Sequence, residues 1–365
     1  MADIIKVGIS QGDINGISYE VIMKTLLDQR ILEMCTPILY GSPKVAAYHR
    51  KALNINNLSL NHIHTPREAG PNRAHVLNCI DDNVRVELGK STTIAGKASF
   101  MALERATSDL QKGLIDVLVT APINKNNIQS EKFNFPGHTE FLARKFGTED
   151  YVMLMVSHDM KVGLVTTHLP ICEVAQNINK EVILSKIRII AKSLQQDFAV
   201  TRPRIAVFGL NPHAGENGLL GKEENEVILP AVIQAKKEGI IALGPYPADG
   251  FFGSSDYRKF DAILAMYHDQ GLVPFKLISF ERGVNFTAGL PVIRTSPAHG
   301  TAYSLAGENK ASPDSFREAL YLAIDIHKNR QVYEEISKDP LKKYNITSNQ
   351  EDEGVDIEDE EDQNY

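Results

Sequence analysis

Tryptophan, paired cysteines and long apolar runs are all missing from this sequence of 365 residues. The three cysteines, Cys35, Cys79 and Cys172, lie far apart, and no Cys-x-x-Cys pair occurs. That spacing argues against a disulfide framework or a cysteine zinc site and predicts a reducing compartment. No apolar run approaches the roughly 20 residues that span a bilayer, and the N-terminal MADIIKVGIS lacks the pattern of a secretory signal. We therefore expect a cytoplasmic protein without a membrane partner.

An excess of charge is also missing once the C-terminal segment is set aside. The formal net charge is −7, but residues 351–365 hold nine acidic side chains and no basic one, which leaves +2 for the rest. No basic patch with interleaved aromatic residues occurs, so nucleic acid is not an expected partner. Because an acidic segment poor in aromatic residues cannot bury a core, we expect residues 348–365 to form a disordered acidic tail.

Two common nucleotide-binding motifs are absent. The first apolar segment is followed by GISQGDINGI, whose glycines do not have the spacing G-x-G-x-x-G, and G-x-x-x-x-G-K-[ST] occurs nowhere. A Rossmann fingerprint and a P-loop are therefore both unsupported. A nucleotide cofactor would have to be held in another way.

Short apolar runs alternate with helical stretches along the chain, which is typical of an α/β protein with a parallel sheet. The predicted strands are Ile4–Ser10, Pro37–Tyr40, Val117–Thr120, Tyr151–Ser157, Lys161–Thr167, Arg204–Gly209 and Ala262–Tyr267. The predicted helices are 17–29, 98–112, 180–197, 223–238 and 314–336. Pro230 is expected to kink the fourth helix or to begin a new turn there.

Three of the apolar runs are each followed by one histidine. His168 follows KVGLVTT, His213 lies in the loop NPHAGENG, and His268 follows AILAMY in a segment where Gly271 is expected to reverse the chain. The carboxyl ends of parallel strands meet at the sheet edge where ligands bind, and three imidazoles suit a catalytic divalent metal. A histidine at such an edge is more often a solvated polar residue, so the pattern alone leaves both interpretations open.

A second group of residues indicates an anion site. The segment FPGHTEFLARKFG predicts a turn before a short amphipathic helix with His138 and Thr139 at its N-terminus, where Thr139 is either an N-cap or part of an anion site. Lys276, Asn285 and Arg294 follow in loops punctuated by glycine and proline. Singly such cations are usually surface residues, but together they could hold a dianionic substrate beside a metal.

The motifs FPGHTE, TTHLP, NPHAGENG, YHDQG…PFK and GLPVIRTSPAHGTA, in this order, resemble the 4-hydroxythreonine-4-phosphate dehydrogenase family of vitamin B6 biosynthesis over roughly residues 3–340. The resemblance implies two α/β/α domains with a central cleft, similar to isocitrate and isopropylmalate dehydrogenases. Residues 1–133 with 276–347 are expected to form one domain, and 134–275 the second, which carries the metal ligands and dimer contacts. The family also implies a homodimer with each active site at the subunit interface.

Roles for individual residues follow from the resemblance. It implies one divalent metal, most simply zinc, with magnesium, cobalt or manganese as alternatives, bound by His168, His213 and His268. It implies substrate contacts by His138, Thr139, Lys276, Asn285 and Arg294. The segment HGTAYSLAG also looks like the cofactor loop of the isocitrate dehydrogenase group, which implies NAD or NADP binding by His299, Gly300, Thr301, Ala302 and Gly307. Asp249 and Asp269 are candidates for the proton acceptor.

The expected activity is NAD-dependent, metal-assisted oxidation and decarboxylation of 4-phosphooxy-L-threonine to 3-amino-2-oxopropyl phosphate, in pyridoxal phosphate biosynthesis. The alternative is a sibling dehydrogenase of a phosphorylated sugar acid, such as threonate or erythronate 4-phosphate, which needs no recognition of an amino group. A metal-dependent hydrolase or lyase would need no HGTAYSLAG loop. A non-catalytic phosphometabolite-binding protein would not need three histidines of the metal-binding type.

One segment departs from the family pattern. The family usually reads GDPAGIGPE, whereas residues 12–20 here read GDINGISYE. The four differing residues are Ile14, Asn15, Ser18 and Tyr19. Loss of the proline removes a restriction on φ and so frees the backbone of this loop.

Overall fold

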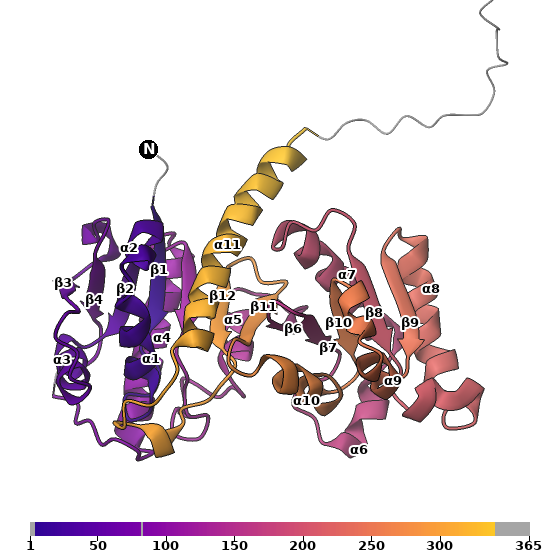
Figure 1. Cartoon of the computed structure of the whole chain (residues 1–365), viewed down its shortest axis with the longest axis horizontal. Coiled ribbons are helices and arrows are strands. Elements are labelled where there is room, and N and C mark those ends of the chain that lie inside the picture. The colour runs from indigo at the N-terminus through magenta and orange to yellow at the C-terminus, as the bar shows by residue number, and fades with distance from the viewer. Residues whose placement is uncertain (1–3, 82, 340–365) are drawn as a thin grey trace, which may run out of the picture.

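A computed structural model describes residues 4–81 and 83–339, which fold around one mixed sheet (Figure 1). The strands are β1 (Ile5–Ser10), β2 (Cys35–Gly41), β3 (Leu60–Ile63), β4 (Ala74–Asn78), β5 (Val117–Thr120), β6 (Val152–Val156), β7 (Lys161–Leu164), β8 (Arg204–Phe208), β9 (Ile241–Tyr246), β10 (Ala262–Ala265), β11 (Val284–Ala288) and β12 (Arg294–Pro297). The helices are α1 (Ser18–Leu26), α2 (Gln29–Met34), α3 (Pro43–Ala52), α4 (Thr93–Gln111), α5 (His138–Lys145), α6 (Ile171–Val174), α7 (Lys180–Gln196), α8 (Leu229–Lys237), α9 (Ala248–Gly253), α10 (His268–Ser279) and α11 (Asp314–Ser337). The predicted acidic tail 348–365 lies outside the described residues.

The sheet consists of two parallel halves joined at an antiparallel centre. Its strand order is β3-β4-β2-β1-β5-β12-β11-β6-β7-β10-β8-β9. The first six strands in this spatial order, β3, β4, β2, β1, β5 and β12, are parallel to one another. The last four, β7, β10, β8 and β9, are also parallel to one another. Strand β11 is antiparallel to both β12 and β6, and β6 is antiparallel to β7. The predicted α/β class is confirmed, while the expectation of a purely parallel sheet is wrong at the centre.

The predicted elements are all present, within a few residues at their ends. The seven predicted strands are β1, β2, β5, β6, β7, β8 and β10, and the five predicted helices are α1, α4, α7, α8 and α11. A π-helical turn over Glu224–Ile228 precedes α8, so Pro230 lies in the first turn of a new helix, as predicted. Strands β3, β4, β9, β11 and β12 were not predicted.

Two local predictions are wrong. Asn285 and Arg294 lie in β11 and β12, and Lys276 lies in α10, rather than in loops. Gly271 does not reverse the chain but lies inside α10, where an added Cβ would come within 2.8 Å of a Val162 methyl carbon on β7. This glycine therefore allows α10 to pack closely against the sheet.

The central strands pack one face against the main core and line a pocket with the other. On β6, Leu154 and Val156 belong to the same core as Phe286 of β11, Ile183 of α7 and Phe316 of α11. Figure 1 shows α11 lying across the middle of the sheet on this side. Because side chains alternate along a strand, the residues between these apolar ones point to the opposite face.

The predicted division into two domains stays a prediction, and its boundary in the sheet falls between β11 and β6. The sheet is continuous there, with Asn285 paired to Met155. No helix in the described part of the chain is long and apolar enough to cross a membrane.

Candidate functional site

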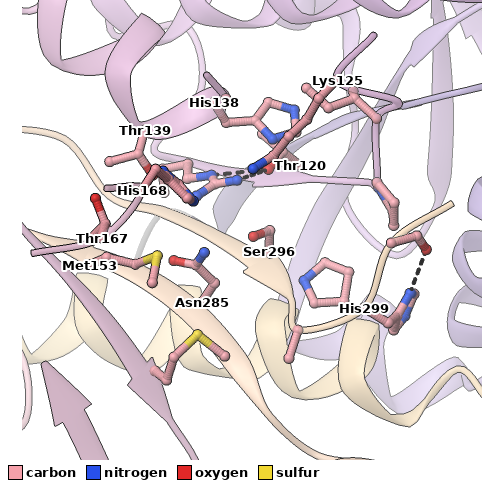
Figure 2. A pocket seen from close by; sticks show the side chains of 18 of the residues that line it. Thr120, Lys125, His138, Thr139, Met153, Thr167, His168, Asn285, Ser296 and His299 are labelled. Atoms are coloured by element: carbon pink, nitrogen blue, oxygen red, sulfur yellow. Dashed lines mark hydrogen bonds between the residues drawn. The ribbon is translucent and has the colours of Figure 1, made fainter. Parts of the chain in front are cut away.

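A pocket of about 270 Å³ lies on the face of the central strands opposite this core (Figure 2). Its floor is a row across three strands, Met155 of β6, Asn285 of β11 and Ser296 of β12, which are direct register neighbours. The walls come from the N-terminus of α5, the segment that follows β7, helix α10 and residues 298–300. The pocket therefore lies where the two halves of the sheet meet.

Arg294 carries a fully buried positive charge in this pocket. Its side chain is 2% exposed, and its Nε and Nη2 atoms donate to the Thr120 hydroxyl at 3.0 and 2.7 Å. The remaining Nη1 is buried without a hydrogen-bond partner among the described residues. Burial lowers the pKa of Arg294 to about 10, so the group stays charged near neutral pH. An unpaired, charged donor in a cavity is suited to an anionic ligand.

His138 and Thr139 begin α5 beside Arg294, as the sequence predicted. Gly137 is the residue that precedes the helix, and Thr139 bonds instead to the Thr287 hydroxyl at 3.3 Å, so the N-cap interpretation of Thr139 is wrong. Burial, followed by the charges of Arg294 and Lys125, holds the pKa of His138 well below its usual range. His138 is thus neutral, and its buried Nε2 has no partner among the described residues.

His168 and His268 meet in the same pocket, with ring centroids 6.4 Å apart. His268 Nδ1 lies 2.7 Å from a carboxylate oxygen of Asp269, which can only accept when ionised. The proton therefore resides on Nδ1, and Nε2 keeps its lone pair for a ligand. His168 Nδ1 lies 3.5 Å from Glu140. Asp269, a candidate proton acceptor, thus contacts a histidine and does not itself line the pocket.

Glu140 is the one acidic side chain that lines this pocket in the described part of the chain. Burial alone would raise its pKa, but the contact with His168, its own backbone N–H and the charge of Lys125 together hold the pKa below its usual value. The carboxylate is therefore ionised and partly balances the cations Arg294, Lys125 and Lys276.

His213 is not brought to this pocket within one chain. It is exposed and begins a run, His213–Asn217, in which all five residues have positive φ. In agreement, no group of three His, Cys, Asp or Glu side chains placed to hold a metal occurs among the described residues. Among the described residues neither His168 nor His268 has a hydrogen-bond partner at Nε2, so the two imidazoles fit part of a metal site, and a third protein ligand would have to come from elsewhere.

The predicted cofactor residues divide into two groups. His299 and Gly300 line the pocket, His299 Nε2 is buried without a partner among the described residues, and an added Cβ on Gly300 would meet open space. Thr301, Ala302 and Gly307 lie outside the lining, in a segment that contains the short 3₁₀ helix Tyr303–Leu305. His299 Nδ1 lies 3.0 Å from the Gly300 carbonyl, so the free Nε2 and the open glycine fit a ligand that reaches this loop from the pocket.

Asp249 lies in α9 and outside the pocket, whereas Lys276 lines it from α10. Lys125 and Ser296 also line the pocket and were not predicted. Lys125 follows the end of β5 in TAPINK, so the reasoning applied to the three histidines would have found it.

The fold and the pocket together define an α/β protein with a cationic ligand site between two halves of one sheet, beside two histidines suited to a metal. Comparison with known proteins makes this more specific. Residues 33–323 match the model of the family described as "Pyridoxal phosphate biosynthetic protein PdxA". The chain belongs to this family.

Individual relatives agree with this assignment. A 4-hydroxythreonine-4-phosphate dehydrogenase from Bacteroides thetaiotaomicron is 57% identical over 341 residues, 93% of each chain. A relative from Oceanobacillus iheyensis, named provisionally as a D-threonate 4-phosphate dehydrogenase, is 39% identical over 88% of this chain and 97% of its own.

Solved structures extend the agreement to the fold. The crystal structure of the Klebsiella pneumoniae 4-hydroxythreonine-4-phosphate dehydrogenase is 35% identical, with a TM-score of 0.76 over 90% of this chain and 98% of that chain. Isocitrate dehydrogenase from Methylococcus capsulatus is only 10% identical, with a TM-score of 0.51 over 91% and 88%, and so shows the fold alone. The expected isocitrate dehydrogenase-like fold is confirmed.

Proposed function

We propose that this chain is the oxidoreductase that converts 4-phosphooxy-L-threonine to 3-amino-2-oxopropyl phosphate in pyridoxal phosphate biosynthesis. The observation that carries the proposal is the buried, unpaired guanidinium of Arg294 beside neutral His138 in a pocket that two further histidines line. A phosphorylated hydroxy acid supplies the anionic groups that such a pocket lacks. The relatives named as 4-hydroxythreonine-4-phosphate dehydrogenases support the same assignment.

The proposed substrate contacts are His138, Thr139, Lys276, Asn285 and Arg294, which all line the one pocket. Arg294 is held in place by Thr120, so its free Nη1 can bind an anionic group without reorganisation. Neutral His138 can accept or donate one proton at Nε2. Asn285 Oδ1 is buried without a partner among the described residues and can accept from a substrate hydroxyl or amino group. These contacts would fix the substrate geometry for hydride transfer.

A divalent metal and a nicotinamide cofactor complete the proposal. His168 and His268 would hold the metal through Nε2, with His213 as the third ligand, and His299 and Gly300 would begin the cofactor site. When bound, the cofactor takes up the hydride, and the cation acidifies the substrate hydroxyl and stabilises the charge that develops on loss of CO₂. Zinc is the metal most typical of three imidazoles, and magnesium, cobalt and manganese remain alternatives for the assay.

A homodimer that shares its active sites is part of the proposal. Exposed His213 and its neighbour Leu219, 79% exposed, could be covered by a partner chain. On α10, Leu277 is 82% exposed directly beside Lys276 of the pocket. A second copy that covers these exposed residues would bring a histidine to the site that one chain leaves incomplete. A cytoplasmic location is proposed on the free state of all three cysteines.

The test is NADH or NADPH formation together with CO₂ release, with each candidate metal present. We expect turnover of 4-phosphooxy-L-threonine and a loss of at least about tenfold in kcat/KM for unphosphorylated 4-hydroxythreonine, because a charge-assisted contact contributes roughly 1.5–3 kcal/mol. Absence of reduced cofactor with every metal and both nicotinamides would contradict the dehydrogenase assignment.

A sibling activity on D-threonate 4-phosphate is the second candidate, favoured by the Oceanobacillus iheyensis relative. The two substrates share the phosphate and the carboxylate and differ at the amino group. The same assay with D-threonate and erythronate 4-phosphates decides between them, since a higher kcat/KM for a sugar acid would move the chain to the sibling activity.

A further inference from the structure

The segment of residues 12–20 that departs from the family pattern is completely buried at its four differing positions. Ile14, Asn15, Ser18 and Tyr19 are each 0% exposed. The Ser18 hydroxyl donates to the Pro122 carbonyl at 3.1 Å, and the Tyr19 hydroxyl donates to Gln11 at 2.6 Å. Ser18 and Tyr19 therefore make polar side-chain contacts that the Gly and Pro of the family pattern GDPAGIGPE cannot make.

Asn15 ties this segment to the loop of residues 87–92. Its Oδ1 accepts from the backbone N–H of Glu87 at 2.7 Å, and its Nδ2 donates to the Lys90 carbonyl at 2.9 Å and to the Thr92 hydroxyl at 3.1 Å. Its own carbonyl accepts from Gly89 N–H at 2.8 Å. An alanine at position 15 could make only the last of these bonds, because the other three use the side-chain amide.

The loop of residues 87–92 lies on its other side against the predicted cofactor loop. A Cβ placed on Gly89 would lie 3.2 Å from the Tyr303 carbonyl oxygen, and a Cβ on Gly307 would lie 2.8 Å from a Leu88 methyl carbon. These approaches leave no space between the two loops. A displacement of residues 87–92 would therefore change the position of residues 303–307.

The departing segment also contacts the cofactor loop directly. The Ile17 N–H donates to the Thr301 carbonyl at 3.0 Å, and the Tyr303 hydroxyl donates to an Asp13 carboxylate oxygen at 2.7 Å. Asn127 donates to the same oxygen at 2.8 Å. The loop after His299 is thus held by residues 13 and 17 on one side and by the segment that Asn15 anchors on the other.

We propose that Asn15 is a positioning residue for the nicotinamide cofactor, which acts by holding residues 87–92 against the loop 301–307. This inference rests on the proposed function, in which that loop continues the cofactor site from His299 and Gly300. Asn15 itself lies outside the pocket lining and need not contact the cofactor. Its three side-chain hydrogen bonds replace the backbone restriction that the family's Pro-Ala pair provides at positions 14 and 15.

The first test compares wild type with Asn15→Ala by titration of NADH or NADPH fluorescence, whichever nucleotide the wild type binds, in the absence of substrate. We expect the Kd to rise about tenfold, because three buried hydrogen bonds that order the loop are lost. The KM for the nicotinamide should rise in parallel, whereas the KM for the phosphorylated substrate and the metal content should change less than about twofold. Asn57→Ala, at an exposed asparagine in the segment between α3 and β3, is the matched control.

The second test is rescue by the family's own residues. In Ile14→Pro/Asn15→Ala the proline restricts the backbone again, and no hydrogen bond from the Ile14 N–H occurs among the described residues that a proline would break. The double variant should recover nucleotide affinity to within about threefold of wild type. If Asn15→Ala does not fold, Asn15→Ser keeps a neutral hydroxyl that can both donate and accept one hydrogen bond, and it should give an intermediate Kd.

Three outcomes would overturn the inference. The first is wild-type nucleotide affinity in Asn15→Ala, and the second is an equal rise in both KM values, which would indicate a general structural role. The third is an unchanged Kd for the nicotinamide in Tyr303→Phe, with a wild type that is active. This would indicate that the nicotinamide binds away from the loop 301–307. A wild type that binds no nicotinamide at all contradicts the proposed function as well, and the titration recognises that case before any variant is made.

Discussion

Arg294 and Thr120 lie on the neighbouring parallel strands β12 and β5, and the Arg294 side chain is held by the Thr120 hydroxyl through two hydrogen bonds. No carboxylate pairs with this guanidinium among the described residues, although it is completely buried. A buried charge without a partner costs stability, so the ligand-free protein carries an energetic cost at this position. A cost in stability of this kind is expected where the charge of Arg294 is needed to bind an anionic ligand.

Arg294→Met is therefore expected to separate stability from function. The unfolding free energy should stay level or rise by about 1–4 kcal/mol, because methionine fills similar space without a charge. The kcat/KM should fall at least about a hundredfold, since charge-assisted contacts to an anionic substrate are lost. Urea denaturation and steady-state kinetics measure the two effects. Arg30→Met, at an exposed surface ion pair, is the control, and a marked loss of stability specific to Arg294→Met would show a structural role instead.

The pH dependence of stability should report on His49. This histidine stacks on Tyr19 with ring centroids 4.6 Å apart, and its Nε2 donates to the Ile14 carbonyl at 2.8 Å. Burial lowers its pKa to about 4 in the folded state. Because the unfolded chain binds the proton more tightly, stability is unaffected above the unfolded pKa of about 6.5 and falls as the pH drops from there toward 4.

Between pH 7.5 and 5.0, His49 should account for a loss of about 2 kcal/mol in unfolding free energy. His49→Gln removes the titrating group, so the variant should lose correspondingly less over this range. Some loss remains, because burial also lowers the pKa values of His138 and His299. The control His62→Gln changes an exposed ring and should behave as wild type. If the unfolding free energies of wild type and His49→Gln fell equally between pH 7.5 and 5.0, the pH dependence could not be assigned to His49.

Glu224 should hold the loop that carries His213. Its buried carboxylate accepts from the backbone N–H groups of Leu210 and Asn211 at 2.8 and 2.7 Å, beneath the left-handed run 213–217. Four of those five residues are not glycine, so the run is strained and depends on its surroundings.

Glu224→Ala leaves two backbone donors without their acceptor and should lower the unfolding free energy by roughly 2–4 kcal/mol. Hydrogen exchange at residues 210–217 should accelerate, while exchange in β1 and β2 should follow only the global change in stability. Glu226→Ala, whose side chain is 66% exposed, is the control. Unchanged protection of residues 210–217 from hydrogen exchange in Glu224→Ala would show that the conformation of this loop does not depend on the Glu224 carboxylate.

The sequence was sufficient to predict the strands whose side chains are buried on both faces of the sheet. Strands β5 and β10 are nearly continuous apolar runs, β1 is interrupted only by the half-buried Lys6, and all three were predicted within a few residues. Strands β11 and β12 were missed because one of their faces lines the pocket. Asn285 interrupts the apolar pattern of β11, which has five residues, and the four residues of β12, RTSP, have no apolar pattern. The residues that form the site are the ones that obscured its secondary structure.

The sequence indicated part of the pocket lining but not its geometry. The five proposed substrate residues and two of the three histidines line one pocket, whereas His213, Asp249 and Asp269 do not, and the roles of all these residues stay predictions. Sequence order cannot show that Asp269 bonds to His268 and lies outside the pocket, or that the backbone of the loop 213–217 is left-handed. Those features depend on packing between elements distant in the chain.

The proposed sharing of the metal site between two chains gives the last prediction. Alanine at His168, His213 or His268 should each reduce metal content, with a loss in metal affinity of about tenfold or more, measured by elemental analysis after competition with a chelator. Because His168 and His268 line one pocket while His213 is exposed elsewhere, we expect His213 to serve the partner's site.

Mixing two inactive variants tests this arrangement. A hybrid of His213→Ala with His168→Ala/His268→Ala contains one complete site, so verified subunit exchange should restore about a quarter of wild-type activity and metal content. A mixture of His168→Ala with His268→Ala contains no complete site and should stay inactive, because both histidines belong to the same pocket. Recovery in the second mixture but not in the first would mean that His168 and His268 serve different sites. Leu277→Asp, at the 82% exposed position on α10, should yield a monomer by ultracentrifugation that retains its fold and loses its metal.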